Sequence, residues 1–112
     1  MLVFSGGTTY AFSYPDKESS SMKFTIEVGE IEKHSVEYDF NPLLGTLVVK
    51  VDNKLVKRHI RLINEPVRET QELVVGNGEK HHVRIEKERT STFTHRNSVF
   101  VNNRLLKVVE NN

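Results

Sequence analysis

Apolar and polar residues alternate along most of the chain from residue 22 onward. The first such stretch sets three apolar residues between polar ones: Phe24, Ile26 and Val28. A period of two is the signature of a strand with one buried face, because successive side chains of a strand point to opposite faces. β-Branched residues dominate these stretches, and Gly or Pro interrupts every segment long enough for a helix. The pattern therefore predicts an all-β protein.

Eight strands are expected from this periodicity and from the turns between the apolar stretches. They cover about residues 23–28, 35–40, 47–51, 54–63, 68–75, 79–89, 99–101 and 106–108. Turns every eight to twelve residues are typical of an antiparallel β-sandwich or a flattened barrel. The alternation is lost at Arg58 and again at residues 62–63, where we expect a bulge or a twist. The expected core includes Val36, Tyr38, Val49, Val83, Ile85 and Val101.

The chain contains an internal repeat. Residues 28–36 (VGEIEKHSV) and 75–83 (VGNGEKHHV) share six of nine positions at an offset of 47, and residues 51–57 (VDNKLVK) return as 101–107 (VNNRLLK) at an offset of 50. The repeat predicts two similar four-stranded halves, 22–64 and 68–110, packed by their apolar faces into one domain, 22–112.

Two-residue links inside the second repeat motif predict tight hairpins. Asp52-Asn53 and Asn102-Asn103 each join two apolar stretches, and both residue types tolerate the left-handed conformation of a type I′ turn. Glycine at Asp52 or Asn53 is therefore expected to be neutral or mildly stabilising.

Residues 1–21 differ in character from the rest. They contain a short aromatic stretch with Tyr10, Phe12 and Tyr14, followed by charged residues and a run of three serines. In one interpretation Met22 is the natural start, and the preceding residues are upstream or non-native sequence. In the other, the alternating aromatic residues form an arm that adds to the edge of a sheet.

Composition excludes several classes of function. Sixteen Lys and Arg against fifteen Asp and Glu give a net charge of +1, which predicts no strong attraction to nucleic acid or to an anionic membrane. The chain has no cysteine, which rules out disulfides, thiolate metal sites and cysteine nucleophiles and fits a cytoplasmic location. No apolar run is long enough for a membrane-spanning helix, and the first residues lack the features of a signal peptide.

The Glu-Lys-His triplets of the repeat are the best candidates for chemistry. His34 and His81 each begin a strand on the side expected to face the core. If the two halves brought these rims together, both imidazoles and Glu32 or Glu79 could ligate a metal such as zinc. Alternatively, each histidine caps the core through a hydrogen bond to a loop, and the two rims lie at opposite ends of the sandwich.

The remaining polar clusters predict no catalysis. No serine lies in a Gly-x-Ser-x-Gly motif or beside a plausible base, and Glu86 and Glu88 belong to a charged outer strand face. His59 and His95 are isolated and expected to be solvated. Residues 57–61 form a basic stripe, yet no aromatic residue for base stacking is near, so nucleic-acid binding is not expected. We expect neither enzymatic activity nor a cofactor.

Several motifs resemble the Fas apoptotic inhibitory molecule family, and more closely short uncharacterised prokaryotic proteins of the same style. The matching stretches are 34–38, 45–54, 74–76, 83–86 and 99–103, within residues 22–109. The resemblance implies a compact, non-catalytic β-domain that acts through protein contacts. The matching residues are scaffold positions, so no apoptotic role is implied for this chain.

Together these observations predict a small interaction or scaffold module. Its free edge strands are the expected contact surface, either for a protein partner or for self-association. The alternative is a metal- or ligand-binding protein that uses the rim histidines His34 and His81.

Overall fold

The fold was obtained as a computed structural model. The structure describes residues 2–5, 8–13, 22–42, 44–60, 66–91 and 94–110, with the backbone alone for the first two segments. The end of the fourth predicted strand, at 61–63, lies outside the described residues.

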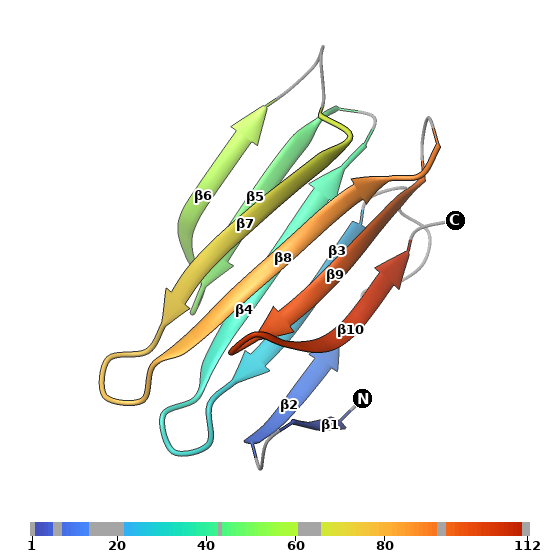
Figure 1. Ribbon diagram of the computed structural model, residues 1–112. Coiled ribbons are helices and arrows are strands. Elements are labelled where there is room, and N and C mark those ends of the chain that lie inside the picture. The colour runs from blue at the N-terminus through green and yellow to red at the C-terminus, as the bar shows by residue number, and fades with distance from the viewer. Residues whose placement is uncertain are drawn as a thin grey trace.

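Eight strands from residue 22 onward form two facing, four-stranded antiparallel sheets (Figure 1). The first sheet contains β3 (Met22–Val28), β4 (His34–Asn41), β5 (Thr46–Val51) and β6 (Lys54–Ile60), in that order. The second contains β7 (Arg68–Val75), β8 (His81–Arg89), β9 (His95–Val101) and β10 (Arg104–Glu110), in the order β10-β9-β8-β7. This confirms the predicted sandwich of two four-stranded halves. The described strands do not close into a barrel.

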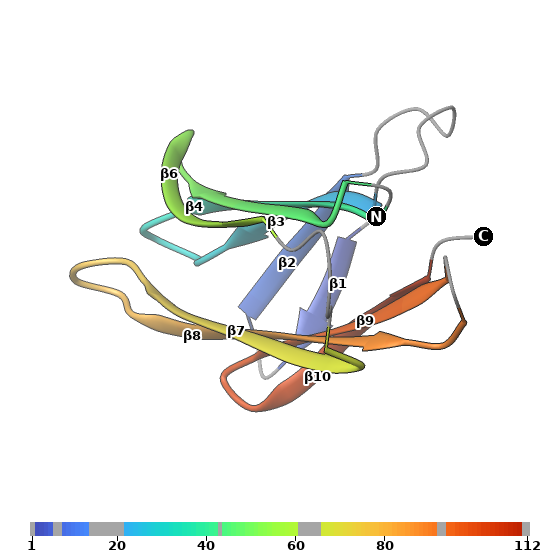
Figure 2. The ribbon, with the colours of Figure 1, turned by 90° about the horizontal axis from the view of Figure 1, so that it is seen from above.

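Two further strands extend the first sheet. β1 (Leu2–Ser5) and β2 (Thr8–Ser13) form a hairpin, and β2 pairs antiparallel with the outer edge of β3. In the register of this pairing, Phe12 lies opposite Ile26. Figure 2 shows the hairpin at one side of the sandwich, where β1 approaches β10 of the other sheet. The hairpin thus covers the side of the sandwich formed by β3 and β10.

The core lies between the two layers and follows the predicted alternation. Its buried side chains come from every second position of the strands, and they include all six residues predicted to be core: Val36, Tyr38, Val49, Val83, Ile85 and Val101. The largest buried side chains, Phe24 and Tyr38, stack with their ring centroids 4.9 Å apart. Such apolar burial is the main favourable contribution to folding.

Both predicted hairpin turns are present. Asp52 and Asn53 have φ of 51° and 65°, and Asn102 and Asn103 have nearly the same values, 52° and 65°. Two consecutive positive φ angles are the hallmark of a type I′ turn, which confirms the prediction.

The structure differs from the sequence-based expectation at the bulge in β6 and at the buried residues of the last strand, β10. The register of β6 against β5 shifts between Val49 and Lys50, so the irregularity lies near Val56, before the predicted position at Arg58. β10 has the same shift between Leu105 and Lys107, at the equivalent place in the second half. Because a bulge changes the parity of the residues after it, Val109 is buried, whereas Val108, within the eighth expected strand, is 40% exposed.

The core assignment is testable by truncation. Ile85→Ala should lower the free energy of unfolding by about 2–5 kcal/mol, because it leaves a cavity between the sheets. Leu105→Ala, an exposed position of β10, is the control and should change it by less than about 0.5 kcal/mol. Chemical denaturation measures both; equal effects would contradict the assignment of the faces.

Candidate functional site

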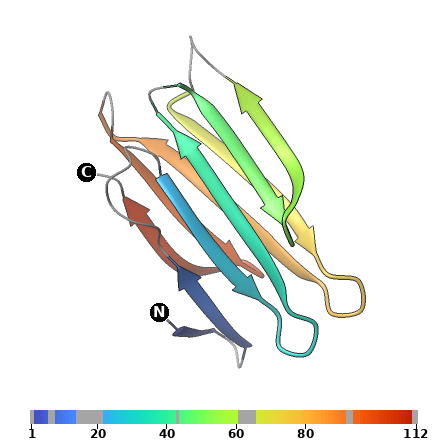
Figure 3. The ribbon, with the colours of Figure 1, turned by 180° about the vertical axis from the view of Figure 1, so that it is seen from behind.

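The two loops that carry the Glu-Lys-His triplets lie side by side at one end of the sandwich (Figure 3). Each loop begins with a glycine of positive φ, 111° at Gly29 and 102° at Gly76. A Cβ atom at Gly29 would lie 2.0 Å from the carbonyl oxygen of Glu32, and one at Gly76 equally close to that of Glu79. Only glycine therefore permits these tight loops.

The loops exchange carboxylates. One oxygen of Glu79 accepts the backbone N–H of residue 30 at 2.8 Å, and the other accepts those of residues 31 and 32 at 2.9 Å. Glu32 reciprocates with the N–H groups of residues 77, 78 and 79, at 2.8–2.9 Å. Three successive N–H groups that converge on one anion form a nest. Each loop thus provides a nest for the carboxylate of the other loop and a carboxylate for the other loop's nest. The six hydrogen bonds join the two sheets.

These bonds stabilise the ionised carboxylates. The backbone N–H of Glu79, followed by that of Asn77, lowers the pKa of Glu32 to about 2. The N–H groups of Glu32 and Glu30 likewise lower the pKa of Glu79 to about 2. Hydrogen bonds to the charged form of an acid have this effect.

The two histidines occupy equivalent positions beside this exchange. His34 Nε2 lies 3.0 Å from Glu32 Oε1, and His81 Nε2 lies 2.9 Å from Glu79 Oε1. The halves of the sandwich therefore bring both rims to the same end. Each imidazole contacts the glutamate of its own loop, and side-chain burial is greater for His81 than for His34.

One substitution within the repeat makes the two rings chemically different. His34 Nδ1 lies 2.5 Å from Asp52 Oδ2, whereas His81 Nδ1 lies 2.9 Å from the amide nitrogen of Asn102. Ionised carboxylates only accept hydrogen bonds, so both nitrogens of His34 favour a proton. The amide nitrogen of Asn102 can only donate, so His81 Nδ1 accepts a hydrogen bond from it, and His81 Nε2 faces Glu79.

The contact between His34 and Asp52 shifts the pKa values of both side chains. The hydrogen bond to Asp52, followed by that to Glu32, raises the pKa of His34 above 6.5. The bond to His34, followed by that from the backbone N–H of Ser35, lowers the pKa of Asp52 below 3.8.

The four candidate metal ligands meet at this rim with their polar atoms engaged. The oxygens of Glu32 and Glu79 accept backbone N–H groups, and the histidines contact those same carboxylates. A metal ion would have to displace these bonds. Within the described ranges, no three His, Asp or Glu side chains are arranged to hold a metal.

A second polar cluster, which the sequence analysis missed, lies inside the sandwich. The Lys87 ammonium lies 3.7 Å from the ring centroid of Phe40 and 4.0 Å from Glu69 Oε1. His95 is fully buried with its ring edge against Phe40, so the expectation that it is solvated was wrong. Asn97 accepts the hydroxyl hydrogen of Tyr38 at 2.9 Å.

The repeat itself held the signal for this cluster. The offsets of 47 and 50 pair Gln71 with Phe24, Lys87 with Phe40, and Asn97 with Leu47. Polar residues of the second half therefore replace apolar residues of the first at buried positions. A cation over an aromatic face and paired polar groups are the usual means of satisfying such burial.

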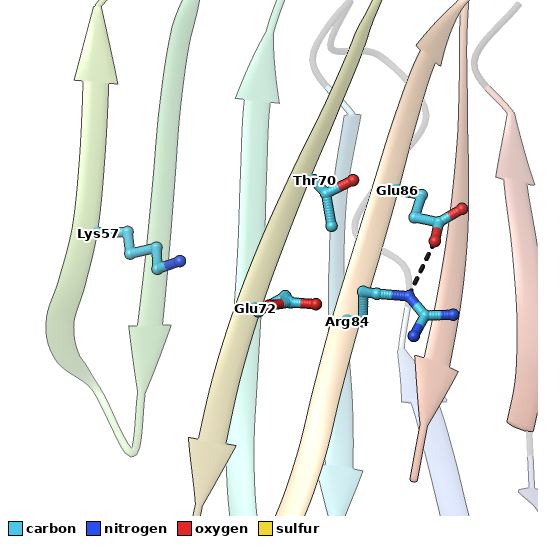
Figure 4. A pocket seen from close by; sticks show the side chains of 5 residues that line it. All are labelled: Lys57, Thr70, Glu72, Arg84 and Glu86. Atoms are coloured by element: carbon cyan, nitrogen blue, oxygen red, sulfur yellow. Dashed lines mark hydrogen bonds and ion pairs between the residues drawn. The ribbon is translucent and has the colours of Figure 1, made fainter. Parts of the chain in front are cut away.

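Two grooves lie beside the edge strands β6 and β7, the first of them along the outer face of the second sheet. One, of about 570 Å³, is lined by Lys57 of β6 and by four residues of β7 and β8 (Figure 4): Thr70, Glu72, Arg84 and Glu86. The other, of about 540 Å³, is lined by residues 56–59 of β6 and 69–71 of β7. Glu69 and Gln71 connect this second groove with the buried polar cluster.

Repeat-related positions show that this open side of the sandwich, at β6 and β7, is more exposed than the side beside the N-terminal hairpin, as far as the described residues reach. Leu106 of β10, on the side of the N-terminal hairpin, is 8% exposed, but its equivalent Val56 on β6 is 48% exposed. Ile26 of β3 is fully buried, whereas its equivalent Leu73 on β7 is only partly buried. Equivalent places in the two halves thus differ in exposure.

The outer edge of β7 offers unpaired backbone groups. The N–H of Arg89 donates to the carbonyl of Val67 at 2.8 Å, one step beyond the pair Arg68 and Glu88 with which the register of β7 and β8 begins. Because backbone groups alternate in direction along a strand, residues 68, 70, 72 and 74 point theirs away from β8. Within the described residues, β7 pairs with β8 alone.

The predicted basic stripe contributes to the groove. Lys57 and His59 lie opposite Val49 and Leu47, whose side chains are buried, so they point toward the interior side of β6. Both line the second groove, and Arg61 lies outside the described residues. On the outer face of the second sheet, Arg84 pairs with Glu86 at 2.8 Å.

No protein-family model, curated protein or solved structure matches the chain. Among the described residues, no helix has the length and apolar character needed to span a membrane.

The carboxylate exchange predicts a particular pH dependence. A carboxylate whose pKa falls on folding stabilises the fold above its unfolded pKa of 4.5, and this stabilisation is lost as pH falls through about 2. The double variant Glu32→Gln with Glu79→Gln should melt at a lower temperature at pH 7. Its melting temperature should also vary less between pH 4.5 and 2. Glu30→Gln, an exposed neighbour, is the control, and an unchanged pH profile of the double variant would contradict the exchange.

The His34 pair predicts a second effect. A histidine whose pKa rises on folding stabilises the fold below its unfolded pKa of 6.5, and this is lost as pH rises through the folded pKa. Asp52→Asn reproduces the arrangement of the other half and should lower the pKa of His34, as measured by NMR titration of the ring. Asp39→Asn is the control. No change in the His34 titration with Asp52→Asn would show that the aspartate does not hold the proton.

Proposed function

We propose that this protein is a protein-interaction module that binds an extended segment of its partner along the free edge of β7. In this mode the added strand forms backbone hydrogen bonds with a sheet edge, and side-chain pockets give selectivity. The observation that carries the proposal is the difference between the two equivalent sides of the sandwich. One side holds a strand on its edge, and the other presents the same edge uncovered by any described residue.

The chain itself provides the template for this binding. β2 pairs with β3 at Thr25, Ile26 and Glu27. The repeat-equivalent residues of β7 are Glu72, Leu73 and Val74, and residues 72 and 74 point their backbone groups to the free edge. An added strand here would also cover Leu73 and lie beside the grooves.

The resemblance of residues 22–109 to the Fas apoptotic inhibitory molecule family agrees with a function in protein contacts. The near-neutral charge and the engagement of the rim carboxylates favour this proposal over nucleic-acid or metal binding. A cytoplasmic location is part of the proposal, and the lack of cysteine supports it.

Proline at Thr70 tests the proposal. Thr70 points its N–H away from β8, so proline there removes a donor from the free edge but none from the sheet. Peptides selected from a random displayed library on the full chain should bind Thr70→Pro about tenfold more weakly than the wild type, for the loss of about one hydrogen bond. Isothermal calorimetry measures this difference.

Thr70→Ala is the matched control and should bind like the wild type. Circular dichroism checks that Thr70→Pro is folded. If it is not, peptides N-methylated at alternate residues replace the variant, because they cannot donate backbone hydrogen bonds to the edge of β7. Peptides that bind Thr70→Pro or their N-methylated forms with full affinity would contradict strand addition.

A further inference from the structure

We infer that the segment bound at this edge is β6 of a second copy of the chain, so that two copies pair reciprocally, β6 with β7 and β7 with β6. The inference rests on the proposed function and names its partner. It follows from strand direction, charge and exposed apolar surface at the open side.

Strand direction allows the pairing. β6 and β7 run in opposite directions at the open side of the sandwich (Figure 1). A twofold axis parallel to the strands preserves the direction of each strand and exchanges the two layers. It therefore places β6 of one copy antiparallel beside β7 of the other, as β2 lies beside β3 within each copy. The same rotation also places β7 of the first copy beside β6 of the second, so both edges are paired and the dimer is closed.

The charges of the two strands are complementary. β6 carries three cations and no acid, Lys54, Lys57 and Arg58, whereas β7 carries two acids beside one arginine. That arginine, Arg68, already pairs with Glu88 at 3.1 Å. Two copies of β6 side by side would repel one another, so the charges favour β6 against β7.

The expected register also agrees with these charges. Residues 56–59 and 69–71 line one groove and so lie at the same level, and the axis keeps that level. Arg58 then lies opposite Thr70 and diagonally beside Glu72 on the outer face, within reach of a long side chain. On the inner face, His59 lies opposite Glu69.

The pairing also covers apolar surface that each copy exposes. Leu55, Val56 and Ile60 of β6 are each about half exposed or more, and Val74 of β7 is 67% exposed. The first sheet of one copy would thus become continuous with the second sheet of the other, and Leu73 would gain the cover that its equivalent Ile26 already has.

Charge reversal tests the inference by sedimentation equilibrium of the full chain. The wild type should be a dimer, and Arg58→Glu or Glu72→Arg should each weaken dimerisation about tenfold or more. Mixing the two single variants should restore the dimer, because a mixed pair carries the reversed charges together at one contact and keeps the native Arg58 and Glu72 at the other. The double variant should dimerise like the wild type.

Lys50→Glu is the matched control, since it makes the same charge change on the outer face of β5, away from the edge. A wild type that stays monomeric at millimolar concentration, or single variants that do not recover on mixing, would overturn the inference. In that case, peptides that still distinguish Thr70→Ala from Thr70→Pro would leave the proposed function standing.

Discussion

The exchange of carboxylates between the two rim loops is the interaction on which the arrangement of the sheets depends. Glu32 and Glu79 each occupy a nest of three N–H groups in the opposite loop, so each loop supplies the acceptor for the backbone donors of the other. The two halves are therefore joined by polar bonds at the rim in addition to the apolar contacts of the core. Because the same residues recur at an offset of 47, one local sequence supplies both partners of a reciprocal contact.

This approximate symmetry makes the differences between the halves informative. Buried Phe24 and Phe40 of the first half correspond to buried Gln71 and Lys87 of the second, and Phe40 packs against the Lys87 ammonium and the His95 ring of the opposite sheet. At the rim, Asp52 of the first half corresponds to Asn102 of the second, so His34 Nδ1 faces a carboxylate whereas His81 Nδ1 faces an amide. At the edges, β3 has the N-terminal hairpin, and β7 has no such cover among the described residues.

Much of the fold could be predicted from the sequence because period-two alternation and the repeat are both local signals. The alternation of Phe24, Ile26 and Val28 located a strand and its buried face, and Asn53 in its turn was recognised by its tolerance of positive φ. The burial of Val109 in place of Val108 could not be predicted, because a bulge changes parity without a distinctive residue. The partners of Glu32 and Glu79 were also beyond prediction, because they depend on how the two halves meet in space.

The two edge strands of the open side, β6 and β7, differ in the features that hinder pairing with a further strand. β6 has the devices that normally discourage edge pairing, namely a bulge near Val56 and the basic residues Lys57 and Arg58. β7 has a regular register over all eight of its residues, with Glu72 on its outer face. The basic residues of β6 repel another basic strand. They favour pairing only with a strand that carries acidic residues. In the proposed dimer, the same charges that disfavour pairing of β6 with a basic strand or with its own copy favour its pairing with β7.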